Sequence, residues 1–355
     1  MKRKNLFLAH TEYHLFILSS LLETYFGDTN DENVILIPEP KNKNRFSLDL
    51  NFQSLSGKVV KLPATGHEKE KRNEFVEVFK NVMDDEYSTY VSFHEQSPIH
   101  YTILNSLDLK KTKVCLAPEG TVPYISINKL AFPSRLRSTL NNYRFMIKQG
   151  VWPKIFRFVG KDHAFMKETD EVWLQYIEKY PNKSEKNVKK IDLFNNEKQI
   201  NSAKKLFNFE YEDHFKKDYN SNILFFLNHT YAEKRVYDFE IEALKRLLQK
   251  FQGSKIYIKL HPNTPAFQIK RYKKLKNIEI NDSTIPAELF ILSLSDSIVF
   301  SFWSASLLIK NPKCNYYWLY PIMQKEVREM DWWEIVNPTS HIHSIRTIDS
   351  MKYPS

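Results

Sequence analysis

Residues 5–25, NLFLAHTEYHLFILSSLLETY, decide the fold class. Residues 5–9 form a short, mostly apolar run, residues 10–14 are mostly polar, and residues 15–25 repeat apolar side chains at helical spacing. A short buried run that opens through a polar turn into an amphipathic helix is typical of a strand, a loop and a helix. The chain therefore begins with one unit of an α/β sheet.

The same alternation continues toward the C-terminus. Further apolar runs lie at residues 34–37, 90–93, 114–117 and 172–174, with helical patterns such as residues 74–83 between them. Strands that alternate with helices favour a parallel sheet covered by helices on both faces. The first half of the chain is thus predicted to be a doubly wound domain.

A second alternation follows a polar junction. Residues 180–219 are rich in Lys, Asn, Glu and Asp. Beyond them, strands are expected at residues 223–227, 255–260, 278–280 and 297–300, and helices at 239–251 and 287–294. We predict two Rossmann-like doubly wound α/β domains, residues 1–190 and 191–355, that face an interdomain cleft in the GT-B arrangement.

Composition limits the possible partners and the compartment. The 355 residues suit two domains, and the net charge of +10 attracts phosphates, acidic glycans or an anionic membrane. Cys115 and Cys314 are too few for a disulfide framework or a four-thiolate metal site. No zinc-finger spacing or RNP-like motif occurs, so no nucleic-acid partner is expected.

The N-terminus looks at first like a signal peptide. Residues 2–4 are basic and precede apolar runs, but His10, Glu12 and His14 interrupt those runs. No apolar stretch approaches the roughly 18 residues that a membrane-spanning helix needs. We expect a cytoplasmic protein, with peripheral contact to the inner membrane as a further expectation.

The strongest local motif is KLHPN at residues 259–263, directly after an apolar run. His261 at a strand tip can donate a ring N–H to a phosphate oxygen, and Pro262 fixes the turn that aims it. The alternative is a loop histidine without a ligand.

A second motif, PEG at residues 118–120, follows the apolar run 114–117. The carboxylate of Glu119 can take a proton from a hydroxyl, and Gly120 leaves room for a substrate to approach. The alternative is a surface turn with a solvated glutamate.

Three further groups are candidates for ligand contact. Ser304 and Ser306 follow the run 297–300 and either bind an anion or cap a helix. Glu288, on the first turn of a helix, either accepts from a ribose hydroxyl or complements the helix dipole. His10 and Thr11 follow the first strand and are placed near the substrate; no metal is assigned to the alternating His and Glu side chains there.

Together these motifs resemble the bacterial GT-B sialyltransferases, a group that includes polysialyltransferases and lipooligosaccharide and capsule sialyltransferases. The group shares a D/E-D/E-G motif, a K-x-H-P motif, a glutamate on the following helix and a serine pair. The corresponding residues here are Glu119-Gly120, Lys259 to Pro262, Glu288, and Ser304 with Ser306. Pro118 replaces the first acidic position, and Ala305 splits the serine pair.

The resemblance implies an inverting, metal-independent sialyltransferase. CMP-sialic acid is the donor, and the acceptor is a hydroxyl of a lipooligosaccharide or capsule glycan, which is lipid-linked in one version of this expectation. Glu119, on the acceptor side, removes the hydroxyl proton and His261 assists the departure of CMP. Lys259, Pro262, Glu288, Ser304 and Ser306 hold the nucleotide, and no cofactor is needed.

Three alternatives stay open from the sequence. A CMP-Kdo transferase and a CDP-glycerol-type glycerophosphotransferase would carry similar motifs. A non-catalytic protein that binds acidic polymers would need only the positive charge.

Overall fold

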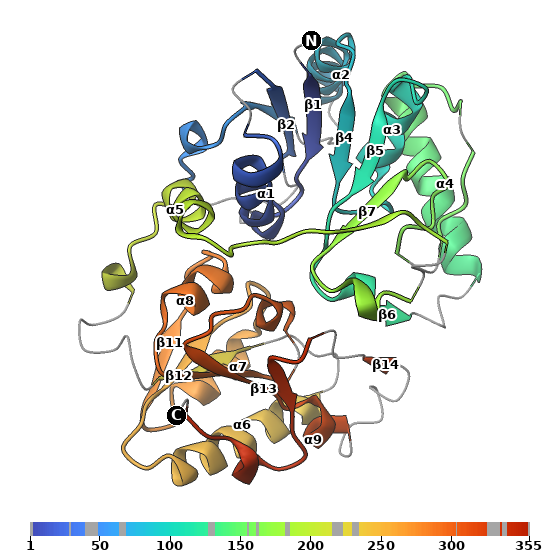
Figure 1. Ribbon diagram of the computed structural model, residues 1–355. Helices are drawn as coiled ribbons and strands as arrows, with labels where there is room; N and C mark the ends of the chain where they lie inside the picture. The colour runs from blue at the N-terminus through green and yellow to red at the C-terminus, as the bar shows by residue number, and fades with distance from the viewer. Residues whose placement is uncertain are drawn as a thin grey trace. The chain divides into compact units, whose positions relative to one another are not determined.

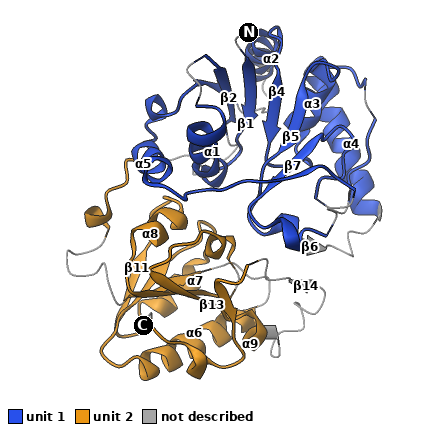
Figure 2. Cartoon of the chain, viewed as in Figure 1, with its two compact units in different colours: residues 1–207 blue, residues 208–355 orange. Residues whose placement is uncertain are grey.

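The computed structural model divides the chain into two compact units, residues 1–207 and 208–355 (Figure 2). It describes residues 3–27, 30–39, 49–63, 69–126, 132–154, 156–160, 163–181, 185–214, 223–228, 234–302, 304–324, 334–335 and 339–353. The division expected from the sequence, 1–190 and 191–355, differs by the segment 191–207. Helix α5 (Glu197–Leu206) of this segment contacts α1 (Glu12–Tyr25) of unit 1.

Unit 1 is built on a seven-stranded parallel sheet of order β3-β2-β1-β4-β5-β7-β8. Figure 1 labels its strands β2, β1, β4, β5 and β7. Its strands are β1 (Lys4–Leu8), β2 (Glu32–Pro38), β3 (Lys58–Leu62), β4 (Thr89–Ser92), β5 (Lys113–Leu116), β7 (Glu171–Leu174) and β8 (Val188–Lys190). Its other helices are α2 (Lys69–Met83), α3 (Pro98–Ser106) and α4 (Phe132–Lys148).

Both faces of this sheet are buried. Side chains of β1 alternate between the two faces, and the consecutive residues Leu6, Phe7 and Leu8 are all buried. Leu6 and Leu8 belong to a core cluster that α2, α3 and α4 complete. Phe7 points the other way and packs edge-on against Phe26, at the end of α1. The apolar run at residues 5–9 is therefore a strand buried on both faces, as predicted.

Unit 2 contains a six-stranded parallel sheet of order β11-β10-β9-β12-β13-β15. Its strands are β9 (Leu224–Leu227), β10 (Ile256–Lys259), β11 (Ile278–Asn281), β12 (Ser297–Ser301), β13 (Cys314–Trp318) and β15 (Ile342–Ser344). Its helices are α6 (Lys234–Lys250), α7 (Ala266–Tyr272), α8 (Ala287–Ser293) and α9 (Tyr320–Gln324). The prediction of two Rossmann-like α/β domains is confirmed, and the cleft between them stays a prediction.

Short elements complete the described chain. The 3₁₀ helices are η1 (Phe52–Ser54), η2 (Val122–Tyr124), η3 (Ile177–Lys179), η4 (Tyr211–Asp213), η5 (Ala305–Leu308) and η7 (Ile348–Ser350). The two-residue strands β6 (Ile125–Ser126) and β14 (Glu334–Ile335) lie outside the two large sheets. In the part of the chain that the structure describes, no helix is both long and apolar enough to cross a bilayer.

The strand order reverses once in each sheet. The reversal lies between β1 and β4 in unit 1 and between β9 and β12 in unit 2. In open parallel sheets, ligands bind outside the carboxyl ends of the strands at such a reversal. The loops after these strands are therefore the place to look for function.

Candidate functional site

Polar side chains gather at the carboxyl edge of the unit 1 sheet. His10 follows β1, His94 follows β4 and Glu119 follows β5, and these three strands are neighbours. His14 joins them from the first turn of α1. We call His10, His14, His94 and Glu119 the Glu119 cluster.

Both carboxylate oxygens of Glu119 face an imidazole. Oε2 lies 3.0 Å from Nδ1 of His94, and Oε1 lies 3.6 Å from Nε2 of His14. Nδ1 of His14 accepts from the backbone N–H of His10 at 3.1 Å, which assigns the His14 proton to Nε2. His14 therefore points an N–H at Glu119.

These contacts shift the protonation of the cluster. Burial raises the pKa of Glu119, but the hydrogen bonds and charges of His14 and His94 outweigh burial and hold that pKa well below its usual range. Burial lowers the pKa of His94, but the hydrogen bond and charge of Glu119, together with Glu95, leave it raised. The cluster thus holds a charged carboxylate beside an imidazole that binds a proton readily.

Other histidines nearby are held neutral. Burial lowers the pKa of His10 and of His100 to about 3, and that of His163 to about 4. Over the described residues, Nε2 of His10 and both ring nitrogens of His163 are buried without a hydrogen-bond partner. Buried polar atoms without partners are unusual in folded proteins, so each of them needs an explanation. A bound ligand that supplies the missing partner is one such explanation.

Glu95 anchors the segment that carries His163. Its Oε2 accepts from the backbone N–H of Phe165 at 2.8 Å, and its Oε1 accepts from Thr169 Oγ1 at 2.5 Å. Burial raises the pKa of Glu95 to about 7. A buried carboxyl group with two local donors fixes this loop beside the cluster.

Thr11 and Gly120 shape the backbone around the cluster. Thr11 is the N-cap of α1 and its Oγ1 accepts from the backbone N–H of His14 at 3.2 Å. Gly120 has φ of 55°, a left-handed conformation that glycine adopts without strain. Each residue sets the position of a cluster member, His14 and Glu119 respectively.

In unit 2, His261 follows β10 on a turn that hydrogen bonds define. Its Nδ1 accepts from the backbone N–H of Asn263 at 3.2 Å, which assigns the proton of the neutral ring to Nε2. The backbone N–H of His261 points at Asn228 Oδ1 at 3.4 Å, and Thr264 Oγ1 donates to the same oxygen at 2.5 Å. The neighbouring Pro262 is exposed.

A buried network holds Asn228. Its Nδ2 donates to Tyr272 Oη at 2.8 Å and lies 3.4 Å from Glu240 Oε2. Glu240 is fully buried and accepts from Tyr272 Oη and, at 2.7 Å, from Gln268 Nε2. We call Asn228, Glu240, Gln268 and Tyr272 the Glu240 network; it supports the His261 turn from inside the domain.

Lys259, Glu288 and Ser306 lie close together. Nζ of Lys259 is buried and donates to the Ser283 carbonyl at 2.5 Å. Burial lowers the pKa of Lys259 to about 8, against the charges of Glu288 and Asp282. Burial raises the pKa of Glu288, against a hydrogen bond from the Ser306 side chain and the charge of Lys259.

Ser304 has the capping role that the sequence left open for it. Its Oγ accepts from the backbone N–H of Ser306 at 3.3 Å at the start of η5. The binding roles expected for Ser304, Ser306, Lys259, Pro262 and Glu288 stay predictions.

The sequence reading missed His94 and Asn228. Both are the first strongly polar residues after an apolar run, at residues 90–93 and 223–227. The rule that located Glu119 and His261 would have found them too.

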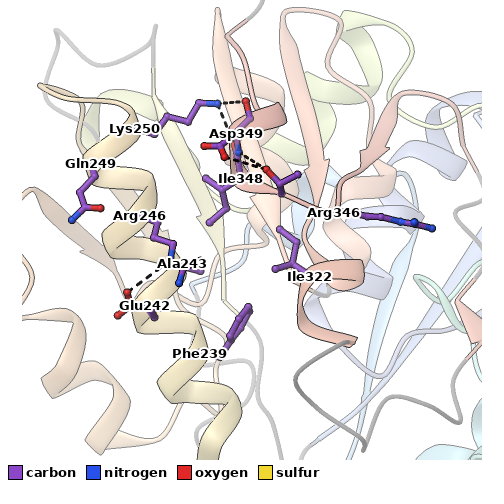
Figure 3. A pocket seen from close by; sticks show the side chains of 11 residues that line it. Phe239, Glu242, Ala243, Arg246, Gln249, Lys250, Ile322, Arg346, Ile348 and Asp349 are labelled. Carbon is purple, nitrogen blue, oxygen red and sulfur yellow. Dashed lines mark hydrogen bonds and ion pairs between the residues drawn. The ribbon is translucent and has the colours of Figure 1, made fainter.

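A pocket of about 490 Å³ opens elsewhere in unit 2, between α6 and the segment 346–349 (Figure 3). Lys250 at its rim bonds the backbone carbonyls of Ile348 and Asp349, and Arg246 pairs with Glu242 on the same helix. None of the residues predicted for the site lines it. We therefore locate the candidate site at the sheet edges.

No three or more His, Cys, Asp or Glu side chains among the described residues are arranged to hold a metal ion.

One family of known proteins matches most of this chain. The family model of alpha-2,8-polysialyltransferase (POLYST) matches residues 5–315. No curated protein matches the sequence.

Solved structures share the fold at low sequence identity. The GT-B domain of a sialyltransferase from Photobacterium damselae is 10% identical, with a TM-score of 0.52 over 96% of this chain and 99% of that chain. The 2,6-sialyltransferase of Photobacterium sp. JT-ISH-224, solved with CMP and lactose, is 11% identical, with a TM-score of 0.52 over 97% and 78%. A UDP-GlcNAc 2-epimerase from Methanocaldococcus jannaschii is 11% identical, with a TM-score of 0.52 over 97% and 89%. The fold is therefore GT-B.

Proposed function

Because the chain belongs to the alpha-2,8-polysialyltransferase family, we propose that it moves sialic acid from CMP-sialic acid to a hydroxyl of a cell-surface glycan, with inversion. The family makes the chain a glycosyltransferase and a sialyltransferase. The CMP donor is supported by the likeness to a 2,6-sialyltransferase that was solved with CMP as donor product and lactose as acceptor. A lipooligosaccharide or capsule glycan is the acceptor in this proposal.

The observation that carries the proposal is the Glu119 cluster at the strand-order reversal of unit 1. Its charged carboxylate and its imidazoles can accept the proton that the acceptor hydroxyl must lose. Inversion requires this hydroxyl to attack the anomeric carbon from the face opposite to CMP.

In unit 2, the Nε2–H of His261 and the hydroxyls of Ser304 and Ser306 stabilise the charge that develops on the departing CMP phosphate. Removing one fixed hydrogen-bond donor of this kind typically lowers the rate about 10²–10³-fold. The leaving group is a monophosphate with little charge to neutralise, so we propose catalysis by these donors without a metal or cofactor.

The donor is tested by offering CMP-sialic acid, CMP-Kdo and CDP-glycerol separately, with a glycan acceptor, and measuring the nucleotide released. We expect acceptor-dependent release of CMP from CMP-sialic acid. Transfer from CMP-Kdo alone, or of glycerophosphate alone, would contradict the donor assignment.

A non-catalytic, polymer-binding protein is separated from an enzyme by thermal shift. A ligand that binds only the native state raises the melting temperature. We expect CMP to raise it and UDP to leave it nearly unchanged. A protein that binds acidic polymers in a salt-sensitive manner but shows no shift with CMP would not be this enzyme.

We also propose that α4 rests on an anionic membrane surface, where a lipid-linked acceptor would be found. Leu136, Leu140 and Ile147 are 39%, 44% and 44% exposed and lie on one side of the helix. Trp152 and Phe156, just beyond the helix, are 73% and 66% exposed. Exposed apolar side chains in such a row are unusual for a surface in water.

The side of α4 next to this apolar stripe, formed by Leu136, Leu140 and Ile147, is basic. Its exposed side chains are Arg137, Arg144 and Lys148. An apolar stripe with a cationic flank suits the interface of a bilayer with anionic lipids.

Sedimentation with vesicles tests the membrane contact. We expect binding to phosphatidylglycerol vesicles, weaker binding to phosphatidylcholine, and loss of binding in the double variant Leu140→Glu, Ile147→Glu. Phe267→Glu, at an apolar side chain of unit 2 that is 41% exposed, is the matched control. Unchanged binding by the double variant would rule out this face.

A further inference from the structure

We propose that the proton of the acceptor hydroxyl passes to Nε2 of His94, and that Glu119 acts through His94 by holding its Nδ1–H. His94 is then the catalytic base, and Glu119 is a positioning residue. The assignment rests on the proposed function and specifies which atom of the Glu119 cluster receives the proton.

The carboxylate of Glu119 has an imidazole at each oxygen. Its two oxygens face Nδ1 of His94 and the Nε2–H of His14, so both are directed at imidazole nitrogens within the protein. Donors on both oxygens stabilise the charged form and weaken it as a base. In agreement, the pKa of Glu119 lies well below its usual range: His14 and His94 outweigh the effect of burial, which alone would raise it.

The contact with Glu119 fixes the tautomer of His94. Because Nδ1 lies 3.0 Å from a charged carboxylate oxygen, it carries the proton of the neutral ring and donates it to that oxygen. Nε2 is then left with a lone pair. The described hydrogen bonds of His94 use its Nδ1 and its backbone N–H and carbonyl, and none uses Nε2.

The two imidazoles differ in how far a substrate can reach them. The side chain of His94 is 40% exposed, whereas that of His14 is 2% exposed. Of the two imidazoles that contact Glu119, His94 is the one that a bound hydroxyl can reach. This arrangement of carboxylate, imidazole and attacking hydroxyl follows the logic of a catalytic triad.

The charges around His94 suit a base. Glu119 and Glu95 favour its protonated form, and burial opposes it. The histidines that interact with it electrostatically are His10, His14, His100 and His163. The net result is a pKa above the usual value for histidine, so the imidazole takes up a proton more readily than an isolated one.

The acceptor oxygen forms a bond to the anomeric carbon of sialic acid while the bond from that carbon to the CMP phosphate oxygen breaks. The electron pair of the broken bond leaves with CMP. The hydroxyl proton goes to Nε2 of His94, and the imidazolium is stabilised by the charge of Glu119.

Chemical rescue is the first test. His94→Ala should lose about 10²–10⁴-fold in turnover, as expected for a general base, and should regain activity when free imidazole is added. His343→Ala, at an exposed histidine of unit 2, is the control and should match wild type with or without imidazole. A preserved melting temperature and CMP-induced shift show that the variant is folded; His94→Gln replaces it if it is not.

The pH profile of Glu119→Gln is the second test. Glu119 raises the pKa of His94, so removing its charge should let His94 lose its proton at lower pH. The rise of kcat/KM with pH should therefore move to lower pH in Glu119→Gln, with reduced but measurable activity. If Glu119 itself were the base, the variant would have no such residual activity at any pH.

The outcomes separate the two proposals. The rescue is measured with whichever of the three donors is turned over. Failure with CMP-sialic acid but success with another donor overturns the proposed function and leaves the base assignment standing. An unrescued His94→Ala that is folded and binds CMP overturns the base assignment, and a chain that uses none of the donors contradicts both.

Discussion

The two units each place a histidine at a sheet edge, but they prepare it differently. In unit 1, Nδ1 of His94 donates to Glu119, so Nε2 presents a lone pair. In unit 2, Nδ1 of His261 accepts from the backbone of Asn263, so Nε2 carries a proton. One imidazole is set to accept a proton and the other to donate a hydrogen bond.

The surroundings of His94 and His261 differ as well. His94 lies among ionisable groups, mainly other histidines and two glutamates, and its protonation responds to them. The turn of His261 is held by the Glu240 network, whose members hydrogen-bond one another inside the domain. A centre that exchanges protons and a centre that holds a group in place are thus built from the same residue type.

The largest effect on nucleotide binding is expected when the hydrogen-bond donor of unit 2, the Nε2–H of His261, is removed. His261→Ala should lower kcat by about 10²–10³ and weaken CMP binding, because a fixed N–H to the phosphate is lost. Turnover and CMP titration of the same preparation measure both. A variant that loses turnover but binds CMP as wild type does would move His261 out of the nucleotide site and weaken the comparison.

A smaller effect is expected from the support beneath His261. Tyr272→Phe removes the hydroxyl that links Asn228 to Glu240 and should lower kcat by about tenfold, because small misplacements of a catalytic group are costly. Tyr353→Phe, which loses a hydrogen bond to Ser254 near the surface, is the control. If Tyr272→Phe lowers only the melting temperature and keeps kcat, the network has a purely structural role.

The smallest effect concerns the stability of unit 1 in acid. The folded pKa of His163 is about 4, below the usual 6.5, so the unfolded chain binds its proton first as the pH falls. Its contribution to stability is present above pH 6.5 and is lost between pH 6.5 and about 4. His163→Asn should therefore make the free energy of unfolding depend less steeply on pH in this range.

Denaturant unfolding at several pH values measures this change, with His343→Asn as the control in unit 2. An equally steep dependence in His163→Asn and the control would show that His163 does not enter the buried set of neutral histidines.

Much of the fold could be predicted from the sequence, because buried parallel strands read as apolar runs. The strand and helix within residues 5–25 and the strand before His261 followed directly. Strand β3 was missed because it is short, its lysines are exposed and its valines are only half-buried, so its pattern does not stand out. Helix α4 was missed since its exposed leucines blur the polar face.

The site could be predicted only in part. Glu119 and His261 each follow an apolar run, which is a local signal. The pairing of His94 with Glu119 depends on β4 lying beside β5. The order of strands in a sheet cannot be read from the local pattern of apolar and polar residues. Glu240 lies on a helix whose sequence predicts only an amphipathic surface, and its role emerges from contacts with Tyr272 and Gln268.

The most direct test of the central claim is the tautomer of the two histidines, measured by ¹⁵N NMR of the neutral rings in the labelled, full-length protein. We predict that His94 carries its proton on Nδ1 and that His261 carries its proton on Nε2. The same tautomer at both positions, or His94 protonated on Nε2 when neutral, would contradict the division of roles between the two units.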